Sequence, residues 1–119
     1  MPPVADKTPD SRRTQMYKGV IELALMSLLA DKAEYGLRIL DGLRKEAGLD
    51  LAEGTLYPLL HRLEKGGLIV AEWRHEAEAS HPRKYYRLTD EGAAELGEQS
   101  RIWLDMTGRL NAFLQRGAK

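Results

Sequence analysis

The feature that most constrains this fold is a helical pattern at the C-terminal end of a short chain. Thr89, followed by Asp90 and Glu91, is a predicted helix N-cap with negative charge in the first turn. From there to about residue 115, large apolar side chains recur on one helix face: Leu96, Trp103, Met106, Leu110, Phe113 and Leu114, widened by Ala93 and Ile102. Such a helix is roughly 40 Å long, more than the diameter of a domain this small. We expect a second copy of the chain to cover the overhanging stripe.

The composition favours one small soluble domain and excludes several classes of protein. The chain of 119 residues has 18 basic and 18 acidic side chains and no cysteine, which excludes disulfides, thiolate zinc sites and cysteine nucleophiles. It contains no phosphate-binding glycine loop, GxSxG or HExxH motif, so we do not expect an enzyme or a cofactor. The polar start is unlike a signal peptide, and the apolar run 20–30 is too short for a membrane span. We expect a cytoplasmic protein.

The first half of the chain predicts an arm followed by helices. Residues 1–13 are polar and proline-rich and form a predicted flexible arm. Residues 17–29 are apolar on nearly every helix face, which indicates a helix buried on more than one side. Residues 35–47 form a predicted amphipathic helix that ends at Gly48. Its apolar side chains are Leu37, Ile39, Leu40, Leu43 and Ala47.

A further helix is predicted over residues 52–65. Asp50 and Glu53 have the spacing of a capping box, and leucines at 56, 59, 60 and 63 form a buried stripe. Pro58 lies near the N-terminal turn, where a bend is expected rather than a break. The opposite face is short, polar and positively charged, with Tyr57 at its border. Its members are Gly54, Thr55, Pro58, His61, Arg62 and Lys65.

A β-hairpin is predicted after the glycines at 66 and 67. Residues 68–74 and 84–88 are rich in β-branched and aromatic side chains, with a polar connection between them. Tyr86 and Leu88 are expected to face the core. Alternation along the second strand then turns three side chains outward: Arg83, Tyr85 and Arg87.

This order of elements is that of a winged helix-turn-helix, a mainly α fold with a small β-hairpin wing and here a long C-terminal dimerisation helix. We expect a DNA-binding domain over 14–89 and the dimerisation helix over 90–119. Small and hydrogen-bonding residues near a helix N-terminus suit insertion into the major groove, and a basic wing suits the adjacent backbone. The candidate DNA-binding residues are Gly54, Thr55, Tyr57, Pro58, His61, Arg62, Arg83, Lys84 and Tyr85.

Four segments of the chain resemble the PadR family of winged-helix transcriptional regulators. They are YKGVIELALMSLLA, YGLRIL, EGTLYPLLHRLEKGGLI and PRKYYRLTDEG, in this order and at matching spacings. The resemblance is to short members that end in one long dimerisation helix. It implies a homodimer that binds a pseudo-palindromic operator, usually as a repressor, with Thr55, Tyr57 and residues 84–85 near DNA.

The chain departs from this family pattern at three places. Ala52 stands where a serine cap is common, so capping is expected to shift to Asp50. The wing tip lacks the usual glycines and carries Glu76 and Glu78, which would repel phosphate. The N-terminal extension is also longer than is typical.

Two other interpretations of these residues remain. Because the chain is neutral and its wing tip is acidic, the same face suits a protein-interaction module that does not bind DNA. The steep salt dependence of DNA binding distinguishes the two functions. The three histidines, His61, His75 and His81, match no compact metal site even with Glu76 and Glu78, so no metal is expected.

Trp103 has two interpretations within the proposed dimer. The predicted dimerisation residues are Leu96, Trp103, Met106, Leu110 and Phe113, and as one of them Trp103 is packed core. Short PadR regulators often bind effectors at the dimer interface, which implies that indoles of two subunits could stack on a planar aromatic ligand.

Overall fold

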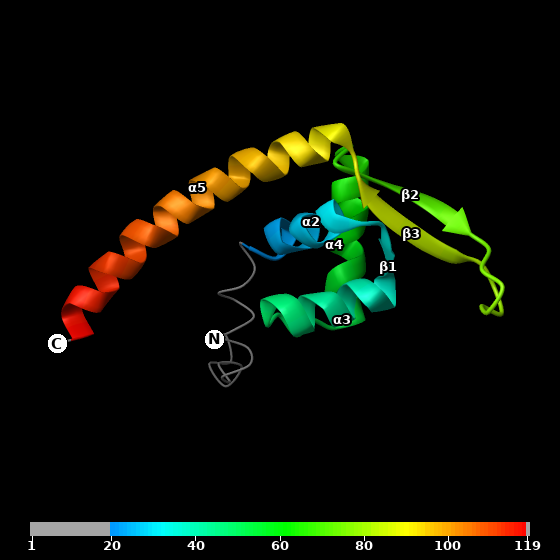
Figure 1. Ribbon diagram of the computed structural model, residues 1–119, viewed down its shortest axis with the longest axis horizontal. Helices are drawn as coiled ribbons and strands as arrows, with labels where there is room; N and C mark the ends of the chain where they lie inside the picture. Colours follow the sequence, from blue (N-terminus) through cyan, green and yellow to red (C-terminus); the bar gives the residue numbers. More distant parts are fainter. Residues whose placement is uncertain (1–19, 119) are drawn as a thin grey trace, which may run out of the picture.

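The computed structural model describes residues 20–118 and has the predicted winged helix-turn-helix architecture (Figure 1). Its elements are α2 (Ile21–Asp31), β1 (Glu34–Tyr35), α3 (Gly36–Ala47), α4 (Glu53–Lys65), β2 (Ile69–Arg74), β3 (Arg83–Leu88), α5 (Asp90–Gln115) and a final 3₁₀ turn, η2 (Arg116–Ala118). The fold is mainly helical, as predicted, with a small antiparallel sheet. The predicted arm and residues 17–19 of the first predicted helix lie outside the described residues.

The hydrophobic core forms where α2 meets its neighbours. This helix contacts α3, β3 and α5, which explains its apolar side chains on several faces. The buried core residues are Leu25, Met26, Leu29, Ile39, Leu43, Leu49, Leu56, Leu60, Leu63, Ile69 and Tyr86. Two predicted members of the α3 stripe are instead exposed. Leu37 lies in the first turn of α3 and Ala47 at its end.

The turn between α3 and α4 corrects the predicted capping box. Gly48 caps α3 in the left-handed conformation, with φ at 69°, as expected of a glycine there. The N-cap of α4 is Ala52, and no side chain caps this helix. The Ala52 carbonyl oxygen instead accepts hydrogen bonds from the amides of Thr55 and Leu56, at 3.0 and 3.1 Å. Neither Asp50 nor its partner Glu53 therefore acts as a cap.

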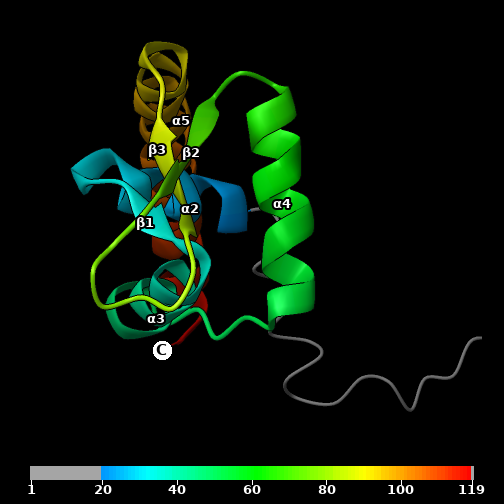
Figure 2. The ribbon, with the colours of Figure 1, turned by 90° about the vertical axis from the view of Figure 1, so that its right-hand side faces the viewer.

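The wing belongs to a sheet of three strands rather than the predicted two. The strand order is β1-β3-β2, and both pairs are antiparallel. Strand β1 has two residues, too few to produce a periodic pattern in the sequence, and it pairs Tyr35 with Tyr85. This pairing ties the start of α3 to the wing. Figure 2 shows the hairpin beside α4, with β1 along its other edge.

Helix α5 starts on the domain and then extends away from it (Figure 1). Thr89 caps it as predicted, since its Oγ1 accepts a hydrogen bond from the Gly92 amide at 2.9 Å. Gly92 is buried against the start of β2, where an added Cβ would lie 2.0 Å from the Leu68 carbonyl oxygen. Leu96, a predicted dimerisation residue, packs half-buried against the domain core. Among residues 20–118, every helix is too short or too polar to cross a bilayer.

Candidate nucleic-acid interface

The outward face of α4 carries small and polar residues. Leu56, Leu60 and Leu63 hold the helix on the core. Gly54, Pro58 and His61 are exposed on the opposite side, and the helix continues through Pro58 without interruption. Thr55 is half-buried, with its amide bonded to Ala52. The N-terminal half of α4 is therefore free of bulky side chains over Gly54, which permits a close approach of another molecule.

Arg62, one of the predicted DNA-binding residues, is held by an ion pair at the side of α4. Its Nε lies 3.3 Å from Oε2 of Glu22 on α2. Glu22 Oε2 is shielded from solvent and accepts no hydrogen bond within the described residues. Arg62 is therefore the counter-charge of Glu22, although the Arg62 side chain is 76% exposed and that of Glu22 is 28% exposed. A contact from Arg62 to DNA would compete with this ion pair.

Tyr57 borders the outward face on the side of the wing. Its ring is 42% exposed, and its hydroxyl lies against Gly36, the buried first residue of α3. An added Cβ at Gly36 would lie 2.0 Å from the Tyr57 oxygen, so this ring position requires glycine there. Burial and the nearby Glu53 carboxylate raise the pKa of the Tyr57 hydroxyl. The hydroxyl therefore keeps its proton at neutral pH and remains a hydrogen-bond donor suited to a phosphate oxygen.

Lys84 lies on the face of the wing that continues from the core. It shares this face with Tyr86, and its Nζ lies 5.5 Å from the centre of the Tyr86 ring. Within residues 20–118 no carboxylate is within ion-pair distance of Lys84. Its charge is therefore available to a polyanion.

The other face of the wing corrects the predicted exposure of Tyr85. This ring is only 8% exposed, because Tyr35 of the unpredicted strand β1 packs edge-on against it at 5.3 Å. The Arg74 guanidinium lies 4.3 Å from the centre of the Tyr85 ring, and the Arg83 guanidinium 4.4 Å from that of Tyr35. Strand alternation correctly predicts the side of the sheet on which Tyr85 lies, but Tyr35 covers that side.

Glu76 at the wing tip completes this second face. It accepts a hydrogen bond from the Tyr85 hydroxyl, and its Oε1 lies 3.9 Å from Nη1 of Arg83. The hydrogen bond raises the pKa of the Tyr85 hydroxyl. Of the predicted wing contacts, Arg83 and Tyr85 thus interact with Glu76, whereas Lys84 has no carboxylate partner among the described residues.

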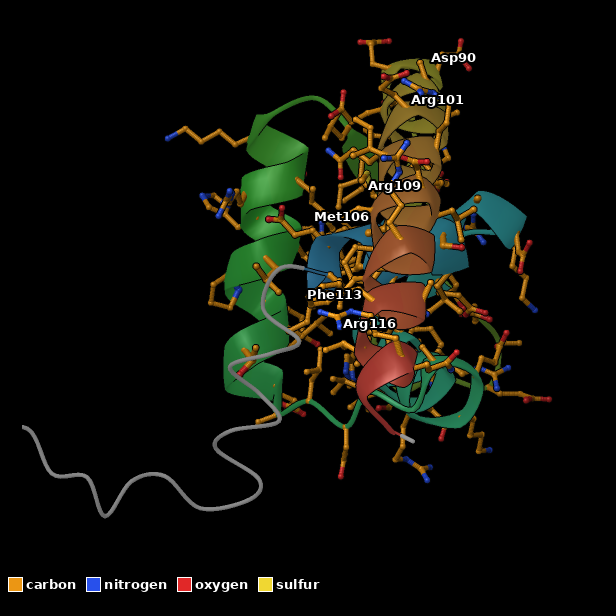
Figure 3. The ribbon with its side chains drawn as sticks, turned by 90° about the vertical axis from the view of Figure 1, so that its left-hand side faces the viewer. Asp90, Arg101, Met106, Arg109, Phe113 and Arg116 are labelled. Carbon is orange, nitrogen blue, oxygen red and sulfur yellow. The ribbon has the colours of Figure 1, made fainter. Side chains whose placement is uncertain are left out.

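A second feature lies at the far side of the domain, beneath α5. Trp103 is half-buried and lines a cavity of about 550 Å³. The other lining residues come from α2, the end of α3 and α5: Val20, Leu23, Ala24, Ser27, Ala47, Leu49, Ser100 and Leu104. Met106, Leu110 and Phe113 lie farther along α5, and each is about half exposed. Figure 3 shows Met106 and Phe113 at one side of α5, with Arg101, Arg109 and Arg116 toward the viewer.

Comparisons with known proteins agree with this geometry. The profile of the PadR-like family of transcriptional regulators matches residues 25–98. The chain belongs to this family. A transcriptional regulator of Mycobacterium tuberculosis is 34% identical over 87 residues, which cover 73% of this chain and 78% of that protein.

Solved structures of PadR regulators have the same fold. One from Eggerthella lenta is 33% identical with a TM-score of 0.78, covering 92% of this chain and 95% of its own. One from Bacteroides fragilis is 40% identical with a TM-score of 0.69, and the match covers 87% of this chain and 99% of that structure's chain. The chain is therefore a transcriptional regulator of the PadR type, and PadR regulators are not enzymes.

The sequence does not reveal the contacts of three residues around this candidate interface. Glu22 was hidden within an apolar helix, and its pairing with Arg62 depends on tertiary contact. Gly36 gives no signal beyond its place at a helix start, although it determines where Tyr57 lies. Glu76 is an acidic departure from the family pattern, but its partners Tyr85 and Arg83 meet it only in the folded wing.

Proposed function

We propose that this protein is a homodimeric repressor that binds a pseudo-palindromic operator. In this proposal α4 enters the major groove with Gly54, Thr55, Pro58 and His61, and Lys84 binds the adjacent phosphate backbone. The observation that carries the proposal is the open outward face of α4 beside a wing lysine without a carboxylate partner. Repression is the usual role implied by the family resemblance, and the cytoplasm is its proposed location.

The proposed dimer forms through α5. Its residues Met106, Leu110 and Phe113 are each about half exposed, which is a large apolar surface for a single helix in water. A second α5 with the same stripe would cover them in a two-fold arrangement. Two α4 helices would then be held at a fixed separation, which a palindromic operator with half-sites about 34 Å apart requires.

An effector site beside Trp103 is the regulatory part of the proposal. The cavity beneath α5 is about 550 Å³, within the ~300–1,000 Å³ typical of small-molecule sites, and its lining is mostly apolar. A planar aromatic compound would stack on the half-buried indole. Its binding would shift α5, and with it the separation of the two α4 helices, if its affinity differs between two dimer geometries.

One observation favours a second function, a winged-helix module that binds a protein and not DNA. Glu76 neutralises Arg83 on the wing, so this part of the domain offers phosphate less charge than the sequence suggests. Such a module would use the exposed face of α4 for an interface with an apolar centre.

A gel-shift titration separates the two functions. The full chain is titrated onto a duplex from the region upstream of its own coding sequence, between about 50 and 200 mM salt. A regulator should bind with an affinity that falls steeply as salt rises, whereas a scrambled duplex should bind weakly. Affinity for neither duplex at any of these salt concentrations would contradict the proposal and favour the protein-interaction module.

A further inference from the structure

A groove of about 860 Å³ separates the wing from the first turns of α3 and α4. Its walls include Gly36, Tyr57, Trp73, Arg83, Lys84 and Tyr86, and the wing-tip residues 78–82, which include the acidic Glu78, border it. It lies on the Tyr57 side of α4, directly beside the outward face described above. Figure 2 shows this side of the molecule, with the wing, α3 and α4 all toward the viewer.

Trp73 is the most unusual residue of this groove. It pairs with Lys84 in the register of β2 and β3, next to the pair of Ala71 and buried Tyr86. The core thus ends at Tyr86, yet the same face of the sheet continues into a tryptophan that is 65% exposed. Neither the core nor the proposed dimer covers this indole, because α5 runs away from the wing (Figure 1).

The chemistry of the groove suits one kind of occupant. A cation without a carboxylate partner, Lys84, lies beside two exposed rings, Trp73 and Tyr57, and the Tyr57 hydroxyl is a donor. A sugar–phosphate strand offers the complementary pattern, because anionic phosphates alternate with apolar deoxyribose faces at short intervals. A simple anion would leave the indole without a partner, and an apolar peptide would leave the lysine without one.

We propose that this groove holds one strand of the DNA backbone, with Trp73 packed on deoxyribose and Lys84 on the neighbouring phosphate. The inference rests on the proposed DNA binding and adds a contact that carries no charge. Stacking contacts of aromatic side chains with nucleic acids differ from lysine–phosphate contacts in one measurable respect. They contribute affinity without releasing counterions, so they leave the salt slope unchanged.

The test compares four variants on the upstream duplex at several salt concentrations: Trp73→Ala, Trp73→Phe, Lys84→Ala and Val70→Ala. Trp73→Ala should weaken binding about tenfold with the salt slope of the wild type, and Trp73→Phe should lose less. Lys84→Ala should weaken binding and lower the salt slope by about one. Val70→Ala is the matched control, since Val70 is also exposed on β2 but faces the other side of the sheet, and it should bind as the wild type does.

A ¹⁹F measurement on the complex of the full chain with the duplex tests the contact directly. It does not require that a Trp73 variant remain stable when bound to DNA. The chain has two tryptophans, so the protein labelled with 5-fluorotryptophan gives two ¹⁹F resonances, which the free Trp73→Phe protein assigns. The Trp73 resonance should shift when the duplex is added. A polyglutamate peptide of matched charge should not shift it.

The outcomes distinguish this inference from the proposed function. If the wild type binds the duplex but its Trp73 resonance stays in place and Trp73→Ala binds equally well, the groove contact is wrong and DNA binding stands. If polyglutamate shifts the resonance as the duplex does, the groove binds acidic peptide instead. If the wild type binds no duplex, the proposed function and this inference fail together.

Discussion

The Thr89 hydroxyl donates a hydrogen bond to the Gly67 carbonyl oxygen at 2.7 Å, joining the N-cap of α5 to the turn that ends α4. Thr89 Oγ1 also accepts a hydrogen bond from the Gly92 amide at 2.9 Å, and the Thr89 amide donates to the Leu68 carbonyl oxygen at 3.0 Å. One residue thus fixes the start of the proposed dimerisation helix relative to the end of the helix proposed to enter the major groove.

Thr89→Ala should therefore lower the free energy of unfolding by about 1 kcal/mol, the usual cost of losing an N-cap, and should weaken DNA binding as well. Urea unfolding and the gel shift measure the two effects. Thr89→Ser keeps the hydroxyl and should restore both. Equal losses in the serine and alanine variants would show that the hydroxyl does not matter.

Gly36→Ala should destabilise the protein by about 1 to 3 kcal/mol, because the new methyl group overlaps the Tyr57 hydroxyl. The same substitution in a Tyr57→Ala background should cost much less, since the obstructing ring is gone. Thermal unfolding of the four proteins gives this double-mutant cycle. Additive effects would place the strain elsewhere. Gly97→Ala is the control, because nothing lies near its Cβ position.

Glu76→Gln should tighten DNA binding and steepen its salt dependence, because Arg83 loses the carboxylate that holds it. Glu78→Gln removes the same charge from the same loop, and among the described residues no ion pair involves Glu78. Glu78 borders the proposed backbone groove but restrains no arginine, so Glu78→Gln should also tighten binding, though by less. Equal gains from the two variants would mean that only net charge matters and that Arg83 is not restrained.

Leu110→Glu should convert the proposed dimer to a monomer at micromolar concentration, because it places a charge within the apolar stripe of α5. Asn111→Glu is the control, since it adds the same charge one position away, off the stripe. Sedimentation equilibrium measures the mass of each protein. A dimeric Leu110→Glu protein would rule out this face of α5 as the interface. Both variants retain Leu96, which packs against the domain.

Planar aromatic compounds should quench Trp103 fluorescence in a Trp73→Phe background if the cavity beneath α5 is an effector site. A panel of cationic and phenolic compounds tests this expectation. If Trp103 is instead packed core, no compound should quench its fluorescence. Trp103→Ala should then lower the free energy of unfolding by about 3 to 5 kcal/mol.

Periodicity and end signals predict the helices well, because both are properties of neighbouring residues. The α5 bounds, Asp90–Gln115, and the end of α3 at Gly48 follow directly from local chemistry. The sequence-based expectations that prove wrong concern residues whose surroundings are set by tertiary contacts. Tyr85 is covered by a strand of two residues that no local pattern marks, and Arg62 is paired with a residue 40 positions earlier. The capping box failed because the turn places Ala52 at the N-cap despite the favourable spacing of Asp50 and Glu53.

The close packing of Gly92 on Leu68 makes α5 a lever with its pivot at one end. The helix has 26 residues, so its far end lies about 39 Å from its start. One degree of rotation at the pivot would displace that end by about 0.7 Å. In a dimer joined near the far ends, a shift of a fraction of an ångström at this glycine contact would be magnified severalfold in the spacing of the two DNA-binding domains.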